Sequence, residues 1–124
     1  MADVTVKRLE EFEAGASGGF FKVRAGLGVK AFGMQFEKFP PNFDGYPEHD
    51  HAEDGQEEVY IPVKGSAVLI AGGEEHRLEP GVFVRVGPGE KRKIVTRGEP
   101  LEILCVGGTP GVAYVPPAYS EEGA

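Results

Sequence analysis

The stretch that decides the fold is "YPEHDHAEDGQEEVYIPVKG", residues 46–65. Two histidines, His49 and His51, stand two residues apart, and several acidic residues follow them. The stretch becomes apolar after Glu58 and ends at Gly65. Because side chains at positions i and i+2 of a strand point to the same side, both imidazoles can face one point. The pair therefore indicates either a metal site or two surface histidines in an acidic loop.

The rest of the chain has the pattern of an all-β protein. Only "RLEEFE", residues 8–13, favours a helix, and it is short enough for one or two turns at most. The predicted strands, separated by glycine- and proline-rich turns, cover residues 20–25, 30–39, 58–65, 66–71, 76–81, 82–86, 91–96 and 101–108, with a further edge strand within 111–124. Roughly eight to ten short strands are typical of a sandwich or barrel. Pro62 cannot donate to a strand ladder, so it should lie at an edge or a bulge.

Composition narrows the class of protein and its partners. A chain of 124 residues that is 40% hydrophobic has the size of one domain and is not a disordered sequence. The net charge is −7 and the only basic run is "EKRK", residues 90–93, which argues against nucleic acid as a partner. Neither a signal peptide nor a membrane span is apparent, and the single cysteine, Cys105, is expected to be a buried hydrophobe. We therefore expect a cytoplasmic protein without a membrane partner.

Glu58 is the natural third ligand for a metal held by His49 and His51. It begins the next predicted strand, and a hairpin that folds back would bring it beside the histidines. Two imidazoles and a carboxylate form a facial triad that leaves positions open for substrate or oxygen. Glu57 and Gln56 are alternative ligands, because the sequence does not fix which of these side chains faces the site.

The order of these residues resembles the cupin family. His49 and His51 supply an H-x-H motif, and Glu58 is followed by six residues and then Gly65. The glycines of a second cupin motif match Gly81 and Gly89. This resemblance covers about residues 30–108 and implies a double-stranded β-helix, or jelly-roll, barrel. On this basis residues 1–124 form a single cupin domain, with an N-terminal arm over 1–19 and a C-terminal tail over 111–124, and the protein is expected to be a homodimer.

The sequence also departs from the cupin motifs. Phe43 stands where the first motif has glycine, although Gly45 follows. Six residues, "AEDGQE", separate His51 from the glutamate, where the family has three or four. In the second motif Gly87 replaces proline and Thr96 replaces asparagine. The longer gap contains an Asp-Gly turn, so a longer loop could absorb it.

The largest departure is Arg92, which occupies the place of the last histidine ligand in the family. Arginine stays protonated and offers no lone pair, so it cannot bind a metal. Two hypotheses follow. In the first, His49, His51 and Glu58 keep the metal, and Arg92 binds a substrate carboxylate or enolate. In the second, Arg92 pairs with Glu58 and no metal is needed. Tyr60 shares the face of Glu58, so it is a second candidate for substrate binding.

The sequence therefore predicts a cupin that binds a small, possibly anionic organic molecule in its barrel. The first hypothesis makes it a metal-dependent enzyme of oxygenase, isomerase or lyase type, with iron, manganese, nickel, copper or zinc as the cofactor. The second makes it a metal-free binding module without catalysis. Neither the substrate nor a catalytic residue is named by the sequence, since the same fold supports many functions.

Overall fold

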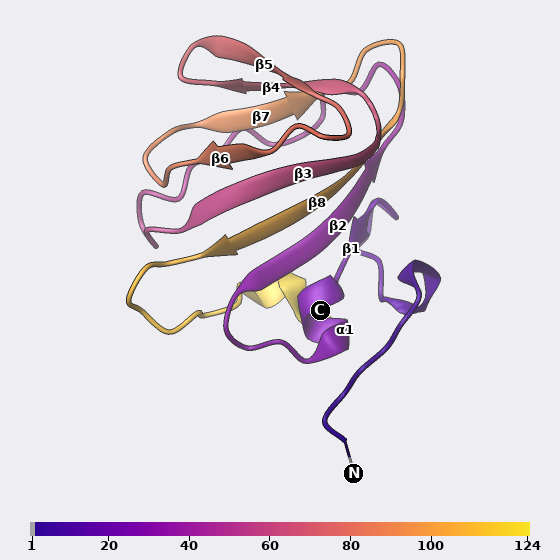
Figure 1. Cartoon of the computed structure of the whole chain (residues 1–124), viewed down its shortest axis with the longest axis vertical. Helices are drawn as coiled ribbons and strands as arrows, with labels where there is room; N and C mark the ends of the chain where they lie inside the picture. The colour runs from indigo at the N-terminus through magenta and orange to yellow at the C-terminus, as the bar shows by residue number, and fades with distance from the viewer. Residues whose placement is uncertain (1) are drawn as a thin grey trace.

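A computed structural model describes residues 2–124 of the chain. The elements in chain order are a 3-10 turn (Leu9–Glu11), β1 (Phe20–Phe21), α1 (Val23–Leu27), β2 (Gly33–Phe39), β3 (Glu57–Gly65), β4 (Ala67–Ala71), β5 (Glu74–Leu78), β6 (Val84–Val86), β7 (Arg92–Val95), β8 (Leu101–Gly108) and a second 3-10 turn (Ala118–Ser120). The larger sheet has the order β1-β2-β8-β3-β6 and the smaller β5-β4-β7. Figure 1 shows how these strands stack along the long axis of the molecule.

The two antiparallel sheets enclose one apolar core, as the predicted jelly roll requires. Inward-facing side chains alternate along β7 and β8, where buried and partly exposed residues follow one another. The core cluster consists of Tyr46, Tyr60, Ala67, Leu69, Leu78, Val86, Ile94, Leu101, Ile103 and Cys105. Cys105 is buried and free, as expected from the sequence. The prediction of an all-β jelly roll is thus confirmed.

Pro62 lies where the sequence analysis placed it, at an irregularity of β3. The pairing of β3 with β8 shifts register between Pro62 and Lys64. On its other side β3 pairs with β6 only over Glu58, Val59 and Tyr60. Proline therefore occupies a β-bulge beyond the end of β6, where its missing N–H costs no ladder bond.

Two predicted elements are wrong. The strand expected over residues 20–25 ends after Phe21, and the chain continues as α1. The alternation of "FFKVRA" indicated a strand, but Lys22 and Arg24 are both buried by contacts with distant parts of the chain. The edge strand expected within residues 111–124 is absent from this described segment, whose only regular element is the short 3-10 turn. The helix of one or two turns expected over residues 8–13 is present as one 3-10 turn, Leu9–Glu11.

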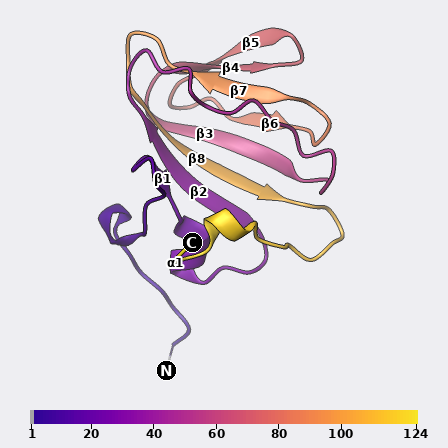
Figure 2. The same ribbon diagram turned by 180° about the vertical axis from the view of Figure 1, so that it is seen from behind.

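The C-terminal segment folds back against α1, and Figures 1 and 2 show the two side by side from opposite directions. The ammonium of Lys22 lies 2.6 Å from Glu13 Oε2 and donates to the carbonyl oxygen of Glu121 at 2.8 Å. Arg24 Nη2 lies 2.9 Å from Glu121 Oε1. Two buried cations therefore hold the last residues over the open end of the larger sheet.

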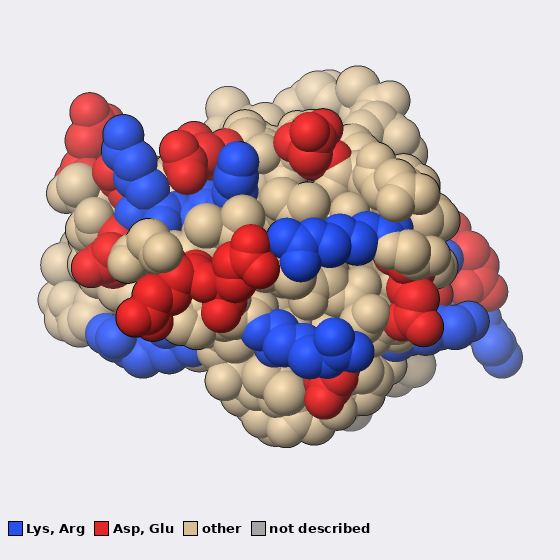
Figure 3. Space-filling view, turned by 90° about the horizontal axis from the view of Figure 1, so that it is seen from above, with Lys and Arg blue, Asp and Glu red and all other residues tan. Residues whose placement is uncertain are grey.

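The surface carries charges of both signs. On the face drawn in Figure 3, Lys and Arg side chains lie between Asp and Glu side chains and do not gather into a basic patch. Within residues 2–124, no helix is long and apolar enough to cross a membrane.

Candidate metal centre

Backbone pairing with β7 positions the two histidines. His49 N donates to the carbonyl oxygen of Arg92 at 3.1 Å, and Arg92 N donates to that of His49 at 2.9 Å. His51 N donates to the carbonyl oxygen of Pro88 at 2.8 Å. The segment thus lies extended along the edge of β7, and its side chains alternate. The rings of His49 and His51 consequently lie together, with centroids 5.2 Å apart and planes at 86°.

Glu58 reaches the same point from β3. Its Oε1 atom lies 3.3 Å from His51 Nε2 and 3.8 Å from His49 Nε2. One ligating atom from each of the three residues falls within a group no wider than 4.8 Å. Glu58 therefore lies beside the histidines, as the sequence analysis expected, but not through a hairpin, because the histidine segment pairs with β7 of the smaller sheet. These three side chains are the metal-ligand candidates. We call them the triad.

The other ring nitrogen of each histidine already has an acceptor. His49 Nδ1 lies 2.9 Å from the carbonyl oxygen of Pro47, and His51 Nδ1 lies 3.1 Å from Asp54 Oδ1. An Nδ1–H group that donates to these oxygens leaves the Nε2 lone pair free. Carboxylate or carbonyl partners of this kind orient histidine ligands in metal sites. Both histidines are therefore prepared to bind through Nε2.

The donor set fits a divalent transition metal. With both Nδ1 atoms protonated, two Nε2 lone pairs and a carboxylate oxygen converge, and such atoms repel unless a cation or a proton lies between them. Two imidazoles and a carboxylate suit iron, manganese, nickel, copper or zinc. Arg92 opposes this fit, because its Nη1 atom lies 3.4 Å from Glu58 Oε1. Three oriented donors nevertheless provide the usual protein share of a catalytic metal site.

Arg92 and Tyr60 both lie behind Glu58. The Arg92 side chain is fully buried, and its Nη2 atom donates to the carbonyl oxygen of Gly87 at 2.8 Å. Tyr60 is 1% exposed, and its hydroxyl donates to Glu58 Oε1 at 2.8 Å. Neither side chain lines the cavity described below. Their direct contact with substrate stays a prediction, and in this structure both support the carboxylate.

The three adjacent candidate ligands, Gln56, Glu57 and Glu58, point in different directions. Glu58 faces the histidines, whereas Glu57 turns outward and accepts from Arg85 Nε at 2.8 Å. Gln56 donates through Nε2 to Asp54 Oδ2 at 3.0 Å. The Asp-Gly turn within the longer gap thus brings Asp54 against both Gln56 and His51. The longer gap between His51 and Glu58 therefore contains Asp54, the residue that orients His51.

Burial and charge act on the triad in opposite directions. Burial raises the pKa of Glu58. Without a metal, hydrogen bonds from the protonated ring of His49 and from Tyr60, with the nearby charges of His51 and Arg92, outweigh burial and lower the pKa overall. The contact with Glu58 raises the pKa of His49, although burial opposes this. Glu58 is therefore an anion at neutral pH, as a metal ligand must be.

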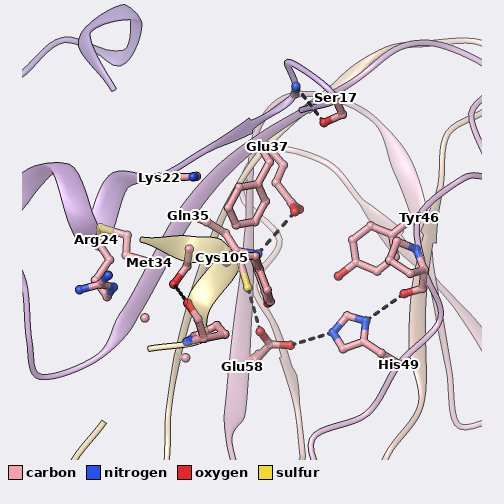
Figure 4. Close-up of a pocket in the computed structure, with 18 of the residues that line it drawn as sticks. Ser17, Lys22, Arg24, Met34, Gln35, Glu37, Tyr46, His49, Glu58 and Cys105 are labelled. Atoms are coloured by element: carbon pink, nitrogen blue, oxygen red, sulfur yellow. Dashed lines mark hydrogen bonds and ion pairs between the residues drawn. The ribbon is translucent and has the colours of Figure 1, made fainter. Parts of the chain in front are cut away.

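The triad opens into a cavity of about 770 Å³. This volume lies within the range of small-molecule sites, roughly 300–1,000 Å³. The inner face of β2 contributes Gln35, Glu37 and Phe39 to its wall, and Tyr114 and Tyr119 of the C-terminal segment cover it. The close view in Figure 4 shows Glu58 and His49 at one side of this space and Glu37 at another.

Several lining residues were missed by the sequence analysis. Asp54 could have been suspected, because an acidic residue in a turn next to H-x-H can reach back to the imidazole. Glu37 gave a weaker signal, a charged residue in an alternating strand. Tyr114 and Tyr119 gave none, since their place depends on the C-terminal segment folding back over the barrel.

Fold and site together define a jelly-roll barrel with a 2-His-1-carboxylate group facing an internal cavity. The sequence profile of the Cupin domain matches residues 35–107. The chain belongs to the cupin family.

Known structures agree with this assignment. A cupin protein from Bacteroides fragilis superposes with a TM-score of 0.74 at 19% identity, over 94% of this chain and 93% of that one. A sugar phosphate isomerase of the cupin superfamily from Silicibacter pomeroyi gives 0.70 at 24% identity, over 86% and 77%. A predicted oxalate decarboxylase from Thermotoga maritima gives 0.64 at 23% identity, over 83% and 97%. No curated protein matches the sequence. At these identities the structural likeness establishes the fold.

Proposed function

We propose that this cupin is a metal-dependent enzyme that acts on a small organic molecule held in the cavity, by oxygenase, isomerase or lyase chemistry. One observation carries the proposal: His49, His51 and Glu58 present ligating atoms to one point at the cavity wall, with both Nδ1 atoms engaged elsewhere. Histidines that only filled space would not need this orientation. Similar structures named as an isomerase, a decarboxylase and lyases support an enzyme of this kind.

Different residues of the chain would bind the metal, orient its ligands and enclose the substrate. His49, His51 and Glu58 would hold the metal, which when bound would polarise a substrate oxygen or bind dioxygen. Asp54 would keep His51 in the tautomer that leaves Nε2 free. Arg92 and Tyr60 would act through Glu58, by holding it ionised and fixed. The aromatic and aliphatic cavity wall would exclude water from the substrate.

Metal content tests the proposal directly. The protein should be purified without a histidine tag and without chelators, and its metals measured by plasma mass spectrometry. We expect stoichiometric iron, manganese, nickel, copper or zinc, lost in His49→Ala and in His51→Ala. His76→Ala is the matched control, because this third histidine lies on β5, away from the triad. Wild-type metal content in His51→Ala would refute the site.

A specific contact favours the second candidate function, a metal-free binding module. Arg92 Nη1 lies 3.4 Å from Glu58 Oε1, so one guanidinium already balances the one carboxylate of the triad. On this alternative, the wild-type protein takes up no metal even after reconstitution, and it retains small organic molecules identified by mass spectrometry of the denatured protein. The same measurement of metal content therefore separates the two functions.

The assembly and location of the protein stay predictions. A homodimer is expected from the resemblance to cupins, and sedimentation velocity on the purified chain would test it. The cytoplasmic location is expected from the free cysteine and would be tested by fractionation of cells.

A further inference from the structure

Glu37 stands out among the cavity-lining residues because it is a buried carboxyl group that forms no salt bridge in the described part of the chain. It lies in β2, opposite Ile103 of β8, and the side chain faces the barrel interior. The residue is 7% exposed. One carboxyl oxygen accepts from Gln35 Nε2 at 3.4 Å, and the other, Oε2, has no hydrogen-bond partner within residues 2–124.

The neighbours of Glu37 do not explain its presence as a structural group. Glu58 and Cys105 face it from β3 and β8, His49 and Tyr46 from the loop before β3, and Tyr119 from the C-terminal segment. Neither a buried carboxylate beside Glu58 nor an unpartnered oxygen favours folding. A leucine or glutamine would fill this place at lower cost. Such groups are found where a site uses them.

Burial, and after it the charge of Glu58, raises the pKa of Glu37 to about 7, against smaller opposing effects of His49 and Gln35. A buried carboxyl group that faces a substrate can both accept and release a proton, and a cation at the triad would favour the carboxylate form that accepts it. In Figure 4 the Glu37 carboxyl group and the triad residues Glu58 and His49 face the same space from different walls. A substrate between them would have its oxygen near the triad and a neighbouring atom near Glu37.

We propose that Glu37 is a further catalytic residue, which moves a proton to and from a substrate whose oxygen faces the triad. The inference rests on the proposed function. The substrate class it selects is a small compound with a C–H bond next to a carbonyl group, because this proton becomes acidic when the carbonyl oxygen is polarised.

The step balances without an oxidant or a second reactant. The Glu37 carboxylate removes the proton from the carbon. The electron pair of the broken C–H bond forms a C=C bond, and the π pair of the carbonyl moves onto oxygen. Glu37 then returns a proton to the same carbon while the electron pair on oxygen re-forms the carbonyl, so the net result is exchange of that hydrogen. Where the carbon also carries a hydroxyl group, transfer of the hydroxyl proton to the enolate oxygen lets Glu37 protonate the former carbonyl carbon instead, and the net result is isomerisation.

Deuterium exchange measures this step without knowledge of the natural substrate. The full chain, reconstituted with each of the five metals, is incubated in D2O with dihydroxyacetone or with pyruvate, and loss of the C–H signal is followed by proton NMR. We expect exchange with at least one probe, slowed by about 100-fold or more in Glu37→Gln, the lower end of the usual effect of an acid–base residue. Glu37→Asp should retain part of the rate.

Two controls separate this role from a structural one. Glu37→Gln should keep the metal content of the wild type, and at pH 6 it should be at least as stable to heat, because it escapes the cost of ionising a buried carboxyl group. Glu102→Gln makes the same chemical change on the neighbouring strand β8, outside the cavity wall, and should leave exchange unchanged.

Each outcome decides something. Wild-type exchange in Glu37→Gln, or no exchange with either probe in a metal-loaded wild type, overturns the role of Glu37 and leaves the metal site standing. A wild-type protein that binds no metal, or exchange that persists after chelation, overturns the proposed function itself.

Discussion

Replacing Glu37 by glutamine should change how stability depends on pH. The carboxyl group has a pKa of about 7 in the folded chain, against 4.5 for an unperturbed glutamate. Because the folded state binds this proton more tightly, the neutral group contributes no penalty below pH 4.5. As pH rises from 4.5 to 7, ionisation of the unfolded chain lowers the free energy of unfolding, and above pH 7 this loss is complete. The difference between the two pKa values corresponds to about 3 kcal/mol, at about 1.4 kcal/mol for each pH unit.

Glutamine has the same shape and no ionisation, so Glu37→Gln should escape this loss. Between pH 5 and pH 8, the free energy of unfolding of the wild type should fall by about 2.5 kcal/mol relative to that of the variant, because part of the loss has already occurred at pH 5. This is a large part of the 5–15 kcal/mol typical of a domain, so urea denaturation would resolve it easily. Shifts of other groups, such as His49 and Asp54, occur in both proteins and largely cancel in the difference.

The measurement should use protein freed of metal by a chelator, because a cation at the triad would favour the carboxylate form of Glu37. Glu102→Gln provides the control for removing one negative charge. The reasoning would be refuted if the difference between wild type and Glu37→Gln stayed constant from pH 5 to pH 8, or if the wild type became relatively more stable as pH rose.

Three further substitutions test the site and the barrel. Asp54→Ala should weaken metal binding by about 10- to 100-fold in a chelator competition, because His51 loses the acceptor that orients it; unchanged affinity would remove this residue from the site. Arg92→His should raise metal affinity by about tenfold or more, since it removes a buried positive charge and adds an imidazole nitrogen that can bind the metal. Weaker metal binding would contradict this. Gly65→Ala should lower the free energy of unfolding by about 3 kcal/mol or more, measured by thermal unfolding, because φ is +83° and a Cβ would collide with a backbone carbonyl. Its control, Gly98→Ala, lies in open space and should leave stability unchanged.

The strands could be predicted because their signals are local. Alternation, apolar runs and glycine or proline turns placed β2, β3, β4, β7 and β8 within a few residues of their observed bounds. The misread segment, residues 20–25, failed for a non-local reason. The chain turns into α1 after Phe21, and Lys22 and Arg24 are buried in ion pairs with Glu13 and Glu121. The second partner lies about a hundred residues away, beyond any pattern in a short window.

The residues of the candidate site also fall into those that local sequence predicts and those that it does not. The H-x-H spacing and the turn that follows it allowed Glu58 to be predicted beside His49 and His51 without knowledge of the tertiary structure. Glu37 could not be recognised, because a charged residue next to Phe36 in an alternating strand is normally exposed. Its burial follows from the sheet packing and from the C-terminal segment that closes the cavity.

For Arg92, the sequence indicates which way the side chain points but not how deeply it is buried. The sequence analysis expected Arg92 to face the site, and its side chain does point inward from β7 toward Glu58. The paired segment at His49 then covers the edge of β7, so the guanidinium is sealed behind Glu58 and does not line the cavity. An effect on anionic substrates can still arise from charge. The triad and Arg92 sum to zero with neutral imidazoles, so a bound divalent cation leaves the group positively charged beside the cavity. Attraction for an anion would then act across the site, without a direct contact with the arginine.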